Sequence, residues 1–157
     1  MQKVSKVKRF IAMTAMAAML SITGLGVAQN SAQANTKDRS WSFNLTIGSE
    51  YKFISKEKKE NTSKIYFNWN GAYNNLTKLM ITPYGSYGVD DSLKPAGNKH
   101  GATRECVVNS TGKYAVTNGV YERGYRYASL GVKSQSGNGT AKGVWSPDCA
   151  GSYTILN

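Results

Sequence analysis

Hydrophobic and polar residues alternate along much of the chain after residue 40. Every second residue is hydrophobic over residues 41–47, and the same period recurs over residues 65–69 and 128–132. A period of two predicts β-strands with one buried face. After residue 34, Leu76, Leu79 and Met80 could form one helical turn, but no longer run has the 3.6-residue period of an amphipathic helix. Clusters of Gly, Asn, Ser and Pro between the runs predict turns.

The same signals predict several further strands. Residues 50–55 and 152–156 each favour a short strand, and residues 78–82 favour one that stops at Pro83, because proline cannot donate a backbone hydrogen bond. The last third of the chain predicts a hairpin over residues 103–119, a long strand over residues 120–135 and a returning strand over residues 140–147. We therefore expect an all-β fold, an antiparallel β-sandwich or small barrel of about seven to nine short strands.

Two polar stretches predict loops. Residues 56–64, KEKKENTSK, have no hydrophobic period, so we expect a solvated loop or strand end there. Residues 89–102 are rich in Asp, Ser, Pro, Gly and Asn, which favour turns over regular strands. This second stretch is the longest predicted loop, and long loops often carry function.

The first 34 residues have the pattern of a secretory leader. Four basic residues precede an apolar run, and Ala32-Gln33-Ala34 is a small-x-small triplet of the kind that signal peptidase recognises. The alternative is an N-terminal membrane anchor; the run approaches the ~20 residues of a span but is diluted by Thr, Ser and Gly. We expect cleavage after Ala34, with residues 35–157 released as a single secreted domain that has no membrane span.

Removal of the leader leaves a basic domain. Four of the 20 basic residues lie in residues 1–34 and all nine acidic residues follow them, so residues 35–157 carry a formal net charge of +7. Such a domain is drawn to anionic surfaces, which makes an anionic cell-envelope polymer or a membrane surface the expected partner. The charges are scattered and form no stripe, which argues against nucleic acid as a partner.

The chain has two cysteines, Cys106 and Cys149. Export to an oxidising compartment favours a disulfide between them. The chain-entropy contribution of closing this loop is about 4 kcal/mol. Two free thiols are the alternative, but neither cysteine lies in a Cys-x-x-Cys motif or beside the histidine.

Few residues are suited to catalysis or metal binding. His100 is the only histidine, so a small secreted hydrolase would depend on it, unless Glu105 and Glu122 act as a pair of glycosidase carboxylates. Asp90 and Asp91 lack the spacing of a calcium-binding loop, and too few ligands remain for zinc once the cysteines are paired. We expect a non-enzymatic protein with no cofactor and no metal.

Aromatic and basic residues near the end of the chain predict a binding face. Tyr and Arg alternate in the predicted strand that contains Tyr125, Arg126 and Tyr127, and Trp145 lies in the strand that follows. Such side chains can stack on sugar rings or contact an envelope polymer. The alternative is that they only stabilise the sheet, through cross-strand pairs that contribute ~0.2–1 kcal/mol each.

The sequence GYRYASLGVKSQSGNGTAKGVWSPDC, residues 124–149, is similar to the tail of an uncharacterised family of small secreted proteins of Gram-positive bacteria. That family joins a Tyr-Arg-Tyr-like strand to a closing Gly-x-Trp-Ser-Pro-Asp. More loosely, AKGVW resembles lactococcin-type bacteriocins, which are β-sandwich proteins that act on the envelope of competing cells. The resemblances imply an extracellular β-sandwich protein and bring no catalytic residues with them. Together with the leader and the +7 charge they favour a secreted protein that binds the bacterial envelope; a bacteriocin-like toxin and a small secreted hydrolase that uses His100 are the alternatives.

Overall fold

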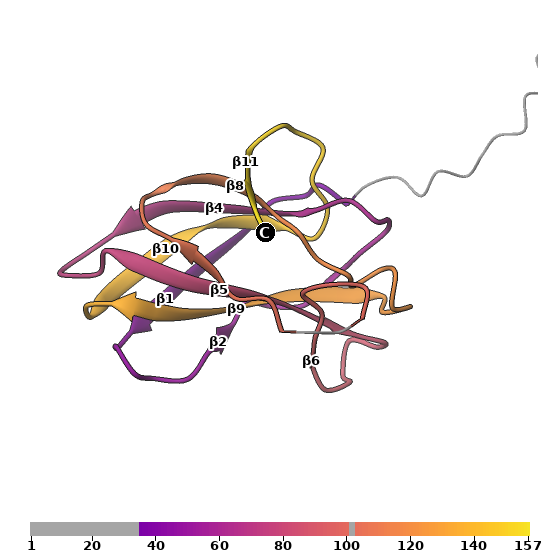
Figure 1. The fold of residues 1–157 in the computed structure, drawn as a ribbon, viewed down its shortest axis with the longest axis horizontal. Coiled ribbons are helices and arrows are strands. Elements are labelled where there is room, and N and C mark those ends of the chain that lie inside the picture. The colour runs from indigo at the N-terminus through magenta and orange to yellow at the C-terminus, as the bar shows by residue number, and fades with distance from the viewer. Residues whose placement is uncertain (1–34, 101–102) are drawn as a thin grey trace, which may run out of the picture. The chain divides into compact units, whose positions relative to one another are not determined.

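The computed structural model describes residues 35–100 and 103–157. The predicted leader, residues 1–34, and its alternative as a membrane anchor lie outside the described residues. The described part of the chain forms strands and no helix, and so contains no helix that could cross a membrane (Figure 1). Its eleven strands are β1 (Arg39–Leu45), β2 (Lys52–Phe53), β3 (Glu57–Lys58), β4 (Ile65–Ala72), β5 (Lys78–Ser86), β6 (Lys94–Pro95), β7 (Cys106–Val108), β8 (Gly112–Val116), β9 (Tyr127–Ser136), β10 (Gly139–Ser146) and β11 (Thr154–Leu156).

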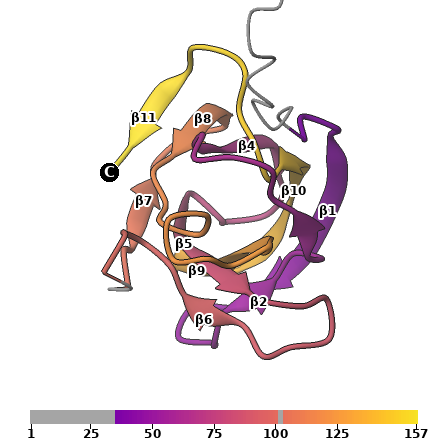
Figure 2. The ribbon, with the colours of Figure 1, turned by 90° about the vertical axis from the view of Figure 1, so that its right-hand side faces the viewer.

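The strands form two sheets that face each other, with β4, β8 and β10 on one side and β2, β5 and β9 on the other (Figure 2). The first sheet has the order β1-β10-β4-β8-β11. The second has the order β2-β9-β5-β6, with β3 also paired with β9 and β7 with β5. Neighbouring strands are antiparallel except β8 and β11, which are parallel. The predicted all-β sandwich is confirmed, with more strands than expected, since the two-residue strands β3 and β6 lie in the stretches 56–64 and 89–102 that were predicted as loops.

The core lies between the two sheets and consists of the side chains that each sheet directs inward. In the first sheet Trp41 stacks on Phe67, with ring centroids 5.1 Å apart. Full burial of a large apolar side chain stabilises a fold by roughly 1.5–3 kcal/mol. The three alternating runs all supply this core, as predicted, except that Ile47 lies beyond the end of β1 and exposes 56% of its surface. The largest apolar residues with almost no exposed surface are Leu45, Ile65, Phe67, Trp69, Leu79, Ile81, Leu130 and Trp145.

Strand β5 does not stop at Pro83, against the prediction. It continues to Ser86, and Pro83 pairs with Leu130 of β9. The Pro83 carbonyl accepts a hydrogen bond from the Ala96 nitrogen, on the side of β6. Because the nitrogen and carbonyl of one strand residue point to the same side, the missing N–H of Pro83 faces the interval between β6 and β7, where no ladder bond is lost.

Residues 103–119 do not form a paired hairpin. β7 pairs with β5 in the second sheet, whereas β8 pairs with β4 in the first. The predicted turn between the two strands carries the chain from one sheet to the other, so each strand pairs with a partner distant in sequence.

The long strand predicted over residues 120–135 is also shorter than expected. Residues 120–124 form a tight turn, closed by hydrogen bonds from the Arg123 nitrogen to the Gly119 carbonyl and from the Tyr125 nitrogen to the Val120 carbonyl. β9 begins only at Tyr127. The turn directs Tyr125 into the core, against Gly85, where an added Cβ would lie 2.4 Å from the Tyr125 ring.

Candidate functional site

Three aromatic rings meet on the outer face of the second sheet. Tyr51 and Phe53 lie at β2 and Tyr84 lies on β5, around Gly131 of β9. Both neighbours of Gly131 in β9 are buried in the core, so Gly131 itself faces outward. A Cβ on Gly131 would lie 3.0 Å from ring atoms of Tyr51 and Tyr84 and 3.2 Å from Phe53, so the glycine makes room for all three rings. We call Tyr51, Phe53 and Tyr84 the aromatic site.

The rings of the aromatic site pack edge to face. The Phe53 and Tyr84 rings are perpendicular, with centroids 4.9 Å apart, and the Tyr51 and Tyr84 centroids are 6.3 Å apart. Such pairs contribute ~0.5–1.5 kcal/mol beyond the area that they bury. Phe53 still exposes 43% of its surface. The site is therefore fixed by packing and remains open to solvent at Phe53.

Polar side chains hold Tyr51 in place. Its hydroxyl accepts a hydrogen bond from Thr82 Oγ1 at 2.9 Å and donates one to Glu105 Oε1 at 2.6 Å. Lys133 Nζ lies 3.4 Å from the same Glu105 oxygen and 4.3 Å from the centroid of the Tyr51 ring. The Glu105 carboxylate thus connects the Tyr51 phenol with the Lys133 ammonium group of β9.

The network shifts the pKa values of its members in opposite directions. Burial and the hydrogen bond to Glu105 raise the pKa of Tyr51, and burial also raises the pKa of Tyr84. The hydrogen bond from Tyr51, with the charge of Lys133, lowers the pKa of Glu105. At neutral pH the site therefore presents neutral phenols and an ionised carboxylate.

A hollow of about 420 Å³ opens beside the rings. Tyr51, Phe53 and Lys133 line one side of it, and residues 48–50 of the preceding turn line the other. Glu50 contributes a carboxylate to this lining. The site thus combines aromatic surfaces with hydrogen-bond donors and acceptors of both charges, which suits a ligand with an apolar face and hydroxyl groups.

Replacement of the Tyr51 hydroxyl tests the network. We expect Tyr51→Phe to lower the free energy of unfolding by about 1–2 kcal/mol at pH 7, since a hydrogen bond to a carboxylate is lost. The raised pKa of Tyr51 gives the difference its pH dependence: it is fully present below about pH 10, the pKa of an unfolded tyrosine, and declines as the pH rises further. Urea unfolding at pH 7 and pH 11 measures both effects. The same loss at both pH values would contradict the role of the network, and Tyr73→Phe, at an exposed tyrosine, is the control.

The predicted binding face is wrong for two of its four residues. Tyr125 exposes 2% of its surface and Trp145 none, and both belong to the core. Arg126 is exposed, with its guanidinium 5.5 Å from the centroid of the Tyr121 ring, and Tyr127 is half-buried. The strict alternation that placed these residues on one face is broken by the turn over residues 120–124.

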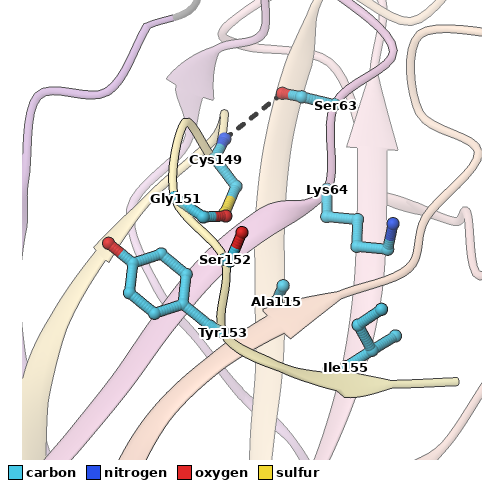
Figure 3. A pocket seen from close by; sticks show the side chains of 8 residues that line it. All are labelled: Ser63, Lys64, Ala115, Cys149, Gly151, Ser152, Tyr153 and Ile155. Atoms are coloured by element: carbon cyan, nitrogen blue, oxygen red, sulfur yellow. Dashed lines mark hydrogen bonds between the residues drawn. The ribbon is translucent and has the colours of Figure 1, made fainter.

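The cysteines do not form the predicted disulfide; both are free thiols. Cys106 is buried on β7 of the second sheet, and its burial raises the pKa of the thiol. Cys149 follows β10 of the first sheet and lines an outer hollow of about 330 Å³ with Ser63 and Tyr153 (Figure 3). The Cys149 nitrogen donates a hydrogen bond to Ser63 Oγ at 3.2 Å, which fixes the loop to this hollow. The two thiols thus belong to different sheets, one facing the core and the other the outer surface.

A buried ion pair joins the segment after β3 to the loop after β10. Lys59 Nζ lies 2.8 Å from Asp148 Oδ1, and both side chains are fully buried. Lys59 also donates to the carbonyls of Ser63 and Pro147, each at 2.7 Å, so its ammonium group has three acceptors. Burial lowers the pKa of Lys59 and the Asp148 carboxylate opposes this shift. The prediction of a solvated segment over residues 56–64 is wrong at Lys59.

The other residues considered for chemistry do not form a site. His100 is exposed in a loop, where its backbone nitrogen donates to Asn98 Oδ1. Asp91 caps the turn after β5 through the Gly88 nitrogen. Within residues 35–100 and 103–157, no three His, Cys, Asp or Glu side chains lie close enough to hold a metal ion.

Comparison with known proteins places most of the chain in one family. Residues 28–149 match the family model described as "Protein of unknown function (DUF2712)". No curated protein matches the chain, and no solved structure does. The match confirms the expected uncharacterised family, whereas the Gram-positive origin, the secretion and the bacteriocin likeness stay predictions. The chain thus belongs to DUF2712, a family of proteins of unknown function.

Proposed function

We propose that this protein is an exported, non-enzymatic β-sandwich that binds a polysaccharide of the bacterial cell envelope through the aromatic site. The observation that carries the proposal is the convergence of three rings over Gly131, beside a polar hollow. Export is supported by the leader pattern of residues 1–34 and by the +7 charge of the remaining chain, which favours the envelope as the place of action.

The chemistry of the aromatic site favours a sugar over a polyanion. A sugar ring has an apolar face of C–H groups that can lie on Phe53, and hydroxyl groups that can bond to Glu50 and Lys133 in the hollow. Glu50 and Glu105 balance the positive charge of Lys133, so the site itself is not strongly basic. The net charge of the domain thus aids approach to the envelope, and the rings provide the recognition.

The state of Glu105 favours binding over hydrolysis. A glycosidase acid must stay protonated near neutral pH, which requires a raised pKa. The hydrogen bond from Tyr51 lowers the pKa of Glu105 instead. Glu105 is therefore suited to accept hydrogen bonds from a sugar and is not suited to donate a proton to a glycosidic oxygen.

Removal of the exposed ring tests the proposal. We expect the secreted protein to be retained on purified bacterial wall polysaccharide, and Phe53→Ala to weaken retention about tenfold or more, which corresponds to about 1.4 kcal/mol. Sedimentation with insoluble wall material, at 50 mM and 500 mM salt, measures it. Retention should depend only weakly on salt, because stacking is not screened as charge attraction is.

Tyr73→Ala is the matched control for this experiment. Tyr73 exposes 51% of its surface, follows β4 of the other sheet and lies under Lys142, so it is also an aromatic residue beside a lysine. Its replacement should leave retention unchanged. Equal losses in the two variants, or no retention of the unaltered protein on any wall polysaccharide, would refute the proposal.

A further inference from the structure

The nitrogen of Asn35 is bound to the buried Asp148. It donates a hydrogen bond to Asp148 Oδ2 at 2.8 Å, and the Asn35 carbonyl accepts one from the Asp148 nitrogen at 3.3 Å. The Asn35 side chain is fixed as well, since its Nδ2 donates to the Lys58 carbonyl at 2.8 Å. The described fold thus begins with a residue whose backbone and side chain are both held.

The two carboxylate oxygens of Asp148 have different partners. Its Oδ1 accepts from Lys59 Nζ and from Ser63 Oγ. Its Oδ2 accepts from the Glu60 nitrogen at 3.0 Å and from the Asn35 nitrogen, and no charged group of residues 35–100 and 103–157 lies on this oxygen. One side of the carboxylate therefore faces an ammonium group, and the other faces two neutral N–H groups.

The position of Asn35 in the sequence relates this contact to cleavage of the leader. Asn35 directly follows Ala32-Gln33-Ala34, the triplet at which the leader is expected to be cut. Hydrolysis of the Ala34–Asn35 bond adds water: the oxygen goes to the Ala34 carbonyl carbon, and the Asn35 nitrogen becomes an amine that is protonated at neutral pH. The atom that cleavage converts into an ammonium group is the atom that already lies on Asp148.

We propose that cleavage after Ala34 places the new α-ammonium group of Asn35 on Asp148 Oδ2, so that removal of the leader completes an ion-pair site around this carboxylate. This inference rests on the export that is part of the proposed function. In the precursor the contact is a neutral amide N–H to a carboxylate; in the mature chain it joins two charges, which makes the hydrogen bond shorter and stronger. The N-terminus of the processed chain is thereby held on the fold by an ion pair with Asp148.

The charged groups around the new ammonium group are compatible with it. Lys59 is on the far oxygen of Asp148, and Lys58 is paired with Glu60 at 3.0 Å. Asn35 is half-buried, so water also reaches the site and the added charge is not sealed in the core.

The experiment uses the full gene in a secreting bacterial host. Protein from the medium should begin with Asn35-Thr36-Lys37 on N-terminal sequencing. The test variant carries Ser-Gly inserted between Ala34 and Asn35, so that cleavage at the same point leaves the Asn35 nitrogen as an amide. We expect the Tm of this variant to be lower by about 3–6 °C. We also expect its α-amine to react at least tenfold faster with an acylating reagent at pH 7, where lysines are mostly protonated.

Asn35→Ser is the matched control, since it keeps the α-amine at the same position and removes only the side-chain contact with Lys58. Its α-amine should react as slowly as that of the unaltered protein. A different first residue would overturn the inference. So would equal reactivity of the unaltered and inserted proteins, even if both are secreted. Failure of wall retention would refute the proposed function alone, because neither readout here depends on a polysaccharide.

Discussion

Lys59→Ala should lower the free energy of unfolding by about 3–5 kcal/mol, because it leaves the buried Oδ1 of Asp148 without the ammonium group that faces it. The Lys59 and Asp148 side chains are fully buried and 2.8 Å apart, so the variant leaves a desolvated carboxylate oxygen without its ammonium group. Such a loss is a large share of the ~5–15 kcal/mol by which a domain is stable. Urea unfolding of the purified domain at pH 7 measures it.

The adjacent Lys58 provides the control. Its ion pair with Glu60 is exposed, so Lys58→Ala should change the stability by less than about 1 kcal/mol. Equal effects of Lys59→Ala and Lys58→Ala would show that the buried pair does not hold the two segments together.

Local sequence patterns predicted the faces of the central strands but not this pair. Ile65, Phe67 and Trp69 are buried as their alternation indicates, because a period of two acts within one strand. Lys59 lies in a segment with no hydrophobic period, and its partner Asp148 is 89 residues away. The burial of Lys59 is determined by the meeting of two distant loops, for which the local pattern carries no signal.

The aromatic site was missed for a related reason. The alternation of Tyr51 and Phe53 predicts a strand, and nothing near them indicates an opposing Tyr84 or a glycine beneath the rings. Their convergence follows from the pairing of β9 with both β2 and β5, which places Gly131 opposite Phe53 and Thr82. A glycine within an otherwise regular strand was the one signal that could have indicated a close approach of other groups.

The disulfide and the binding face were both predicted wrongly, and for the same reason. Pairing of Cys106 with Cys149 was predicted from compartment and count, which say nothing of the sheet to which each cysteine belongs. Likewise, Tyr125 and Arg126 were assigned to one regular strand, although a Gly at residue 124 with φ of 79° allows the tight turn that separates them from β9. In both cases the way in which the chain passes from one sheet to the other determines where the residues lie, and the local sequence pattern does not show it.

Trp145→Ala should lower the free energy of unfolding by about 3–5 kcal/mol and leave wall retention of the folded protein unchanged. Trp145 has no exposed surface and lies in β10 opposite Phe67 of β4 and Arg39 of β1, so its removal leaves a cavity at the centre of the first sheet. Thermal and urea unfolding measure the loss, and sedimentation with wall material at a temperature where the variant is folded measures retention. Arg126→Ala, at an exposed position, should change neither quantity appreciably.

Trp145→Phe keeps an aromatic ring in the core and removes the indole N–H. The Trp145 Nε1 atom is buried and has no hydrogen-bond partner in the part of the chain that the structure describes, so phenylalanine removes an unsatisfied donor together with part of the ring. We therefore expect Trp145→Phe to cost about 1–2 kcal/mol, well below the alanine variant. A loss of wall retention in Trp145→Phe at full stability would mean that Trp145 contributes to binding after all. Retained binding with reduced stability would place Trp145 in the core alone and leave recognition to the aromatic site.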